Sequence, residues 1–138
     1  MSRLAIFLDD GGVMNDNQLR GPQWQRLVGE FFPPLLGGVP EAWAQANRSV
    51  AERLWDEYTR TMRGRVDADY AAFWRENQIA WLRGMCELVG LPSPSEDESF
   101  DLAERATEYV TPRVRSTFGG VVEAIRALHT GGYRLHTA

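Results

Sequence analysis

The stretch from residue 4 to residue 14, LAIFLDDGGVM, constrains the fold most, because an unbroken apolar run ends there against two acids and two glycines. An uninterrupted run such as residues 4–8 is typical of a strand buried on both faces, inside a parallel sheet covered by helices. Asp9 falls at the carboxyl end of this strand, which is the end at which open α/β sheets bind ligands. Gly11 and Gly12 allow a sharp turn and a close approach of the backbone to a ligand.

A β-hairpin is the alternative, because Asp-Gly-Gly is also common in hairpin turns. A hairpin needs a returning strand, and Val13 and Met14 are followed at once by the polar residues 15–18. The pattern therefore favours a ligand-binding strand end over a hairpin.

Composition restricts the class of protein. The 138 residues are 43% hydrophobic and 25% charged, which is ordinary for one soluble domain. With a net charge of −4 and scattered arginines, the chain has no basic patch for nucleic acid or for an anionic membrane, so neither partner is expected. The first apolar run is too short for a signal peptide or a membrane span, so we expect a cytoplasmic protein. Cys86 is the one cysteine, which excludes an internal disulfide, and we interpret it as a small apolar helix residue.

The middle of the chain, residues 19–110, predicts a compact antiparallel bundle of about four helices. Prolines, glycines and capping residues mark their ends. The predicted helices run from Pro22 to Pro33, from Pro40 to near Gly64, from a cap at Asp67 to Gly90, and from a Ser95–Glu98 capping box to Thr111. Large rings at helical spacing normally fill an interior, so we assign core positions to the tryptophans Trp43, Trp55, Trp74 and Trp81.

The last part of the chain returns to α/β character. Gly119 and Gly120 precede a short helix with Val122, Ile125 and Leu128 predicted to face inward. Two glycines then end this helix, and residues 133–137 predict a strand that ends in Thr137.

The opening stretch resembles the first motif of the haloacid dehalogenase-like hydrolases, an apolar strand followed by D-x-D-G-T-L or, in some members, D-x-G-G-V-L. In this register Asp9 falls on the nucleophile, Asp10 on the variable position and residues 11–14 on the rest of the motif. A second register would place Asp10 on the second acid, but it puts Leu8 at the nucleophile position. A leucine cannot attack a substrate, so we prefer the first register.

The last helix and strand are similar to the second motif of the same family, in which a Ser or Thr hydroxyl binds a phosphoryl oxygen. Thr137 matches that position. The resemblance implies an α/β fold with a partial, Rossmann-like parallel sheet, formed by residues 1–18 and 111–138. Residues 19–110 would be an inserted helical cap that excludes water and selects the substrate.

In the chemistry that the resemblance implies, Asp9 attacks the substrate and forms a covalent ester that water hydrolyses. Asp9 and the backbone carbonyl of Gly11 would bind Mg²⁺, which offsets the repulsion between the carboxylate and an anionic substrate. Gly12 and Thr137 would contact the substrate. The leading hypothesis is therefore a Mg²⁺-dependent, phosphatase-type hydrolase acting on a small phosphorylated molecule.

Two further hypotheses stay open. Gly11 lacks the acid that protonates an alkoxide leaving group, whereas a halide leaves without a proton, so carbon–halogen hydrolysis is the alternative within the family. A non-catalytic binding module is the alternative outside it. A homodimer is a candidate oligomeric state for any of these functions.

The chain contains no lysine, and Arg113, Arg115 or Arg134 would have to replace the family's cation. The later motifs have no counterpart, so we expect an N-terminal part of a larger protein or a truncated product, inactive by itself.

Other polar residues are weaker candidates. Asp10, Asn15 and Asp16 follow the first strand, where they either contact a ligand or form an ordinary polar loop. We expect His129 to face solvent at a helix end and His136 to be a structural residue of the last strand.

Overall fold

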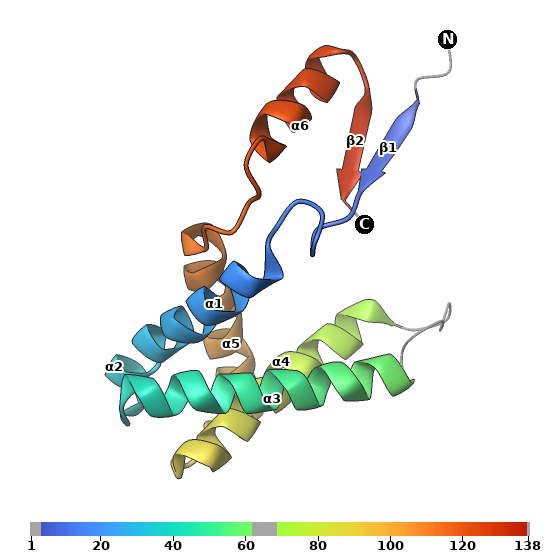
Figure 1. The fold of residues 1–138 in the computed structure, drawn as a ribbon. Coiled ribbons are helices and arrows are strands. Elements are labelled where there is room, and N and C mark those ends of the chain that lie inside the picture. Colours follow the sequence, from blue (N-terminus) through green and yellow to red (C-terminus); the bar gives the residue numbers. More distant parts are fainter. Residues whose placement is uncertain (1–3, 62–68, 138) are drawn as a thin grey trace. The chain divides into compact units, whose positions relative to one another are not determined.

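The computed structural model describes residues 4–61 and 69–137, and most of them are helical. Figure 1 shows the elements along the chain. In order they are β1 (Ala5–Leu8), α1 (Asn17–Phe31), α2 (Pro33–Leu36), α3 (Pro40–Thr61), α4 (Tyr70–Val89), α5 (Glu96–Val110), the 3₁₀ turn η1 (Thr111–Arg113), α6 (Val121–Thr130) and β2 (Arg134–Thr137).

The chain divides into two compact units. The strand unit consists of Met1–Gln23 and Val114–Ala138, and the helical unit consists of Trp24–Arg113. The domain boundaries predicted after residues 18 and 110 stay a prediction.

The predicted α/β fold class is wrong. The described chain is mostly helical, with only a two-stranded sheet, and it does not show a Rossmann-like fold. The physical reason is that the two strands have four residues each, whereas the long helices have 15 to 22 residues. A Rossmann-like sheet needs several parallel strands with helices on both faces.

The first strand is also less buried than predicted. Along β1, exposed and half-buried residues alternate, and the Phe7 side chain is 68% exposed. In the described structure β1 pairs only with β2, and α6 packs against β2. One face of this small sheet therefore remains open to solvent, and the prediction that β1 is buried on both faces is wrong.

The helical unit contains the core. Its helix α4 packs against both α3 and α5. The rings of Phe32 and Trp43 are stacked with their centroids 4.8 Å apart, and the indole N–H of Trp81 donates to Asn47 Oδ1 at 2.8 Å. The fully buried large side chains there are Trp43, Phe32, Leu82, Met85, Val28, Val50, Val110 and Cys86.

These positions test the assignment of the tryptophans. The core positions predicted for Trp43 and Trp81 are confirmed, because they are 0% and 7% exposed. The prediction for Trp55 is wrong, because it is 66% exposed. The buried residues of α3 end at Val50, so Trp55 lies beyond the part of the helix that contacts the core.

The ends of the helices follow local chemistry. Gly90 has a φ of 78° and ends α4 in the left-handed conformation, and Ser95 and Glu98 form the predicted capping box. The cap predicted at Asp67 lies outside the described residues, as do Gly64 and the residues around it. The observed cap of α4 is Asp69, whose side chain accepts a hydrogen bond from the backbone N–H of Ala72 at 3.1 Å.

The last helix and strand form where the sequence predicts them, with one difference of detail. The half-buried side of α6 contains Val121, Ile125 and Leu128, whereas Val122 is 42% exposed.

Among the described residues, no helix combines the length and the apolar character that crossing a membrane requires.

Candidate functional site

The candidate site lies where the two strands of the strand unit end. β1 and β2 are parallel, and their register pairs Leu8 with Thr137 (Figure 1). Asp9 is the next residue after Leu8, so Asp9 and Thr137 lie at the same end of the sheet, on neighbouring strands. The hairpin alternative is wrong, because the partner of β1 comes from the other end of the chain.

The two consecutive acids have different environments. Asp9 is exposed, and within residues 4–61 and 69–137 no hydrogen bond or ion pair to its carboxylate is found. Asp10 is half-buried and its carboxylate is occupied on both oxygens. Oδ1 accepts from the amide of Asn15, and Oδ2 accepts from Arg20 Nη1 at 2.5 Å. The two acids therefore differ in their contacts: the Asp9 carboxylate is exposed, whereas the Asp10 carboxylate is bound within the protein.

These contacts change the acidity of Asp10. The hydrogen bond from Asn15, and after it the hydrogen bond and charge of Arg20, lower the pKa of the Asp10 carboxyl below its ordinary value of 3.8. The backbone carbonyl of Asp10 also accepts from the N–H groups of Met14 and Asn15, at 3.0 and 2.9 Å. Asp10 therefore holds the loop after β1 in place.

The same loop is joined to a segment about a hundred residues later in the chain. The N–H of Asp16 donates to the carbonyl of Ser116 at 2.7 Å, and the Ser116 hydroxyl donates to Asn15 Oδ1 at 3.0 Å. Ser116 is buried, and the N–H of Phe118 donates to the carbonyl of Met14 at 3.1 Å. The residues after β1 are thus fixed by polar contacts, and Asn15 links Asp10 to Ser116.

Sequence reasoning missed Arg20 and Ser116. Arg20 lies 10 positions from Asp10, and Ser116 lies 101 positions from Asn15. No local pattern connects residues at such separations, since only the fold brings them together. The place of Arg20 on the first helix after an acidic loop is compatible with the ion pair to Asp10. Many chains have this arrangement, so it does not identify the partner of the arginine.

The two glycines of the motif have structural uses. Gly12 has a φ of +79°, a conformation that side chains rarely adopt, and its N–H donates to the carbonyl of Asn15 at 2.8 Å. Gly12 is predicted to contact the substrate, but its N–H is used within the loop. At Gly11, an added Cβ would lie 3.2 Å from the side chain of Asn17. The end of the Asn17 side chain would therefore have to shift by a few tenths of an ångström to accept a side chain at residue 11.

The donors at the strand end suit Mg²⁺ in chemical type. Mg²⁺ binds oxygen, commonly through one or two carboxylates with water and substrate phosphate as its other ligands. The Asp9 carboxylate and the Gly11 carbonyl are such donors. In the described part of the chain no three His, Cys, Asp or Glu side chains gather where they could bind a metal. Asp10 is bound to Arg20, and Asp16 Oδ1 accepts from the N–H of Gln18 at 2.8 Å.

The arginines predicted to replace a catalytic lysine have other contacts. Arg134 pairs with Ala5 at the start of β2, about 10 Å along the strand from Thr137. Arg113 belongs to the helical unit, where its guanidinium lies 4.0 Å from the centre of the Tyr109 ring. Arg115 donates through Nη1 to the carbonyl of Val114 at 3.0 Å. The cation that the fold brings next to the motif is Arg20.

The histidines take structural or exposed positions. The ring of His136 stacks on the ring of Phe7 with the centroids 5.1 Å apart, across the pair that these residues form in the sheet. His129 is exposed at the end of α6, as predicted.

Comparisons with known proteins do not assign the chain to a family. No protein-family profile matches the sequence, and no curated protein matches it at a significant level. The functional interpretation therefore depends on the residues of the strand unit.

Proposed function

We propose that the strand unit carries the nucleophile of a hydrolase similar to the haloacid dehalogenase-like enzymes, with Asp9 as the attacking group. The substrate would be a small phosphorylated molecule, and the hydroxyl of Thr137 would donate to a phosphoryl oxygen. The observation that carries this proposal is the parallel register that pairs Leu8 with Thr137. It supports the proposal because residues 9 and 137 then lie at the same end of neighbouring parallel strands, the end at which such sheets bind ligands.

The difference between Asp9 and Asp10 also supports this assignment. A nucleophile must have a lone pair free to attack, and the Asp9 carboxylate has no partner in the described structure. Asp10 accepts from both Asn15 and Arg20, which suits a residue that positions the loop. The register that assigns the second acid to Asp10 would require this ion pair to open before catalysis.

The proposed reaction has two steps. A carboxylate oxygen of Asp9 attacks phosphorus, the bond from phosphorus to the leaving oxygen breaks, and an aspartyl phosphate forms. Water then attacks phosphorus and releases inorganic phosphate, which returns the carboxylate. When bound by Asp9 and the Gly11 carbonyl, Mg²⁺ would reduce the repulsion between the carboxylate and the substrate. Gly11 supplies no acid, so aryl and acyl phosphates, whose leaving groups need no proton, are the preferred substrate class.

Carbon–halogen hydrolysis is the second candidate, and the residue type at position 11 favours it. Gly11 has no acid to protonate a leaving group. A halide leaves without a proton, and the ester would form between Asp9 and carbon. A non-catalytic binding module remains the third candidate.

Trapping of the covalent intermediate tests the first of the two steps, which needs Asp9 but no turnover, with the chain as it is. The protein is incubated with acetyl phosphate and Mg²⁺, reduced with borohydride, which converts an aspartyl phosphate to homoserine, and analysed by peptide mass spectrometry. We expect label at residue 9, no label in Asp9→Asn and retained label in Asp10→Asn. Label at residue 10 would favour the other register. Release of halide from a 2-haloacid without acetyl phosphate labelling would favour the second candidate, and no reaction with either reagent would favour a binding module.

A further inference from the structure

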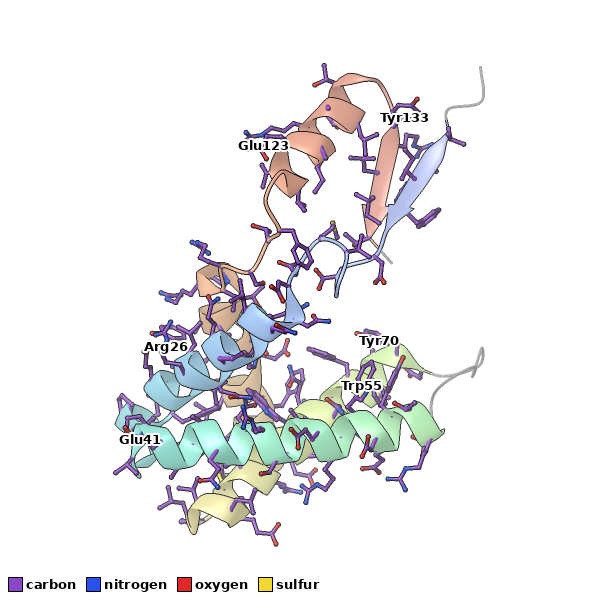
Figure 2. The ribbon with its side chains drawn as sticks, in the orientation of Figure 1. Arg26, Glu41, Trp55, Tyr70, Glu123 and Tyr133 are labelled. Atoms are coloured by element: carbon purple, nitrogen blue, oxygen red, sulfur yellow. The ribbon has the colours of Figure 1, made fainter. Side chains whose placement is uncertain are left out.

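The strand unit leaves its apolar side chains uncovered. All the buried hydrophobic residues that the structure describes lie in the helical unit, between Leu27 and Val110. In the strand unit the exposed fractions of Leu4, Phe7 and Tyr133 are 65%, 68% and 41%. A two-stranded sheet with so little covered surface is marginal in water. Figure 2 shows Tyr133 just before β2, and in the described structure no further strand lies beside the pair of β1 and β2.

The hydrogen-bond pattern identifies the groups that face the open edge of β1. The N–H of Arg134 donates to the carbonyl of Leu4, and Ala5 pairs with Arg134. In a parallel ladder, alternate residues of one strand bond to the neighbour. The backbone groups of residues 4, 6 and 8 therefore face β2. The N–H and C=O groups of Ala5 and Phe7 face the other edge, where the described chain has no strand.

We propose that this edge pairs with β1 of a second copy of the chain, as an antiparallel strand pair across a two-fold axis. Antiparallel residues that exchange hydrogen bonds do so in both directions, and such pairs alternate with unbonded pairs. If Ile6 faces Ile6 of the second copy, Ala5 faces Phe7 of that copy and Phe7 faces Ala5. Every outward N–H and C=O of the two strands is then bonded. Within β1, a register centred on residue 5 bonds only Ala5 to Ala5 of the second copy, and one centred on residue 7 bonds only Phe7 to Phe7.

The residue types of the two edges favour β1 over β2. β1 reads AIFL and contains neither a charge nor a proline, the features that normally prevent pairing of edge strands. β2 reads RLHT, and an antiparallel β2 pair would bring arginines and histidines of two copies together. The described residues of the strand unit contain four acids and four arginines, so two such units do not repel through net charge. A second copy is therefore a matched partner for this edge.

The first test is disulfide cross-linking, which depends on the register. Across the axis the two Ile6 positions form an unbonded pair with Cα atoms about 4.5 Å apart, within the range that a disulfide spans. The two Phe7 positions are about 8 Å apart, beyond that range. We expect Ile6→Cys to form a covalent dimer under mild oxidation and Phe7→Cys to remain monomeric in non-reducing gels. Cys86 is buried in both variants. Equal cross-linking of the two variants, or none in either, would overturn the proposal.

The second test removes one donor at the edge. Ala5→Pro deletes an N–H that faces away from β2, so the β1–β2 ladder keeps its bonds, and Ala5→Ser is the matched control that retains the N–H. Each of the two copies loses one N–H, so the dimer loses two hydrogen bonds. We expect the dissociation constant of the dimer, measured by sedimentation equilibrium, to rise by about tenfold to a hundredfold. Circular dichroism checks that each variant is folded. A monomeric parent, or equal association of the two variants, would contradict the proposal. Both tests measure association and not catalysis, so they are independent of the role proposed for Asp9.

Discussion

Arg20 Nη1 lies 2.5 Å from Oδ2 of Asp10, so the second of the two consecutive acids after β1 is joined to the first helix of the chain. Both side chains are a little more than one-third exposed, at 38% and 39%, so solvent screens their attraction. The pair leaves Asp9 as the acid of the motif that can approach a ligand. It also gives a direct way to separate the two acids by experiment.

Replacement of Arg20 by Gln should raise the pKa of Asp10 toward 3.8 but not fully to it, because the hydrogen bond from Asn15 is the larger cause of the shift. A carboxyl with a lowered pKa stabilises the fold above its unfolded pKa, and this contribution is lost as pH falls through the folded pKa. We therefore expect Arg20→Gln to lower the free energy of unfolding by about 0.5 kcal/mol near neutral pH, and by less in acid. Urea unfolding at both pH values measures this. Arg126→Gln, an exposed arginine of α6, is the control. An equal loss in acid and at neutral pH would contradict the prediction.

Alanine at Gly12 should destabilise the loop after β1, because a side chain is strained at a φ of +79°. We expect a loss of about 1–2 kcal/mol in the free energy of unfolding. Gly119→Ala is the matched control, since a Cβ there meets nothing within 4 Å and its φ is not positive. Thermal unfolding of the two variants compares them. Similar melting temperatures for both would show that the loop does not keep this conformation.

Two glycines of α1 should respond differently to alanine. At Gly29 an added Cβ would lie 2.5 Å from the carbonyl oxygen of Pro40, so the helix must shift, and we expect a loss of about 1–3 kcal/mol. At Gly21 the added Cβ meets nothing within 4 Å beyond its chain neighbours, but the ring of Pro22 disfavours a helical residue with a Cβ before it and offsets the higher helix propensity of alanine, so we expect a change within about 0.5 kcal/mol. Urea unfolding measures both. Equal stability of the two variants would mean that α1 does not approach Pro40 as closely as described.

The sequence by itself determined the local elements. Helix ends at Gly90 and at the Ser95–Glu98 capping box follow from conformations and hydrogen bonds within a few residues, so their chemistry can be read along the chain. The last helix and the strand after it are likewise local. Gly131 and Gly132 end the helix, and the strand that ends at Thr137 follows them. The local pattern also places Asp9 at the end of a strand, and the resemblance of residues 4–14 to a family motif makes it the candidate nucleophile.

Only the tertiary structure decided what these elements assemble into. The parallel pairing of Leu8 with Thr137, the ion pair of Asp10 with Arg20 and the contact of Ser116 with Asn15 join positions 10 to 129 residues apart. Exposure was decided in the same way, since Trp43 and Trp55 lie on one helix and only the first reaches the core. The small sheet stays open because no other described strand covers it, and an apolar run alone cannot tell how many neighbours a strand will find.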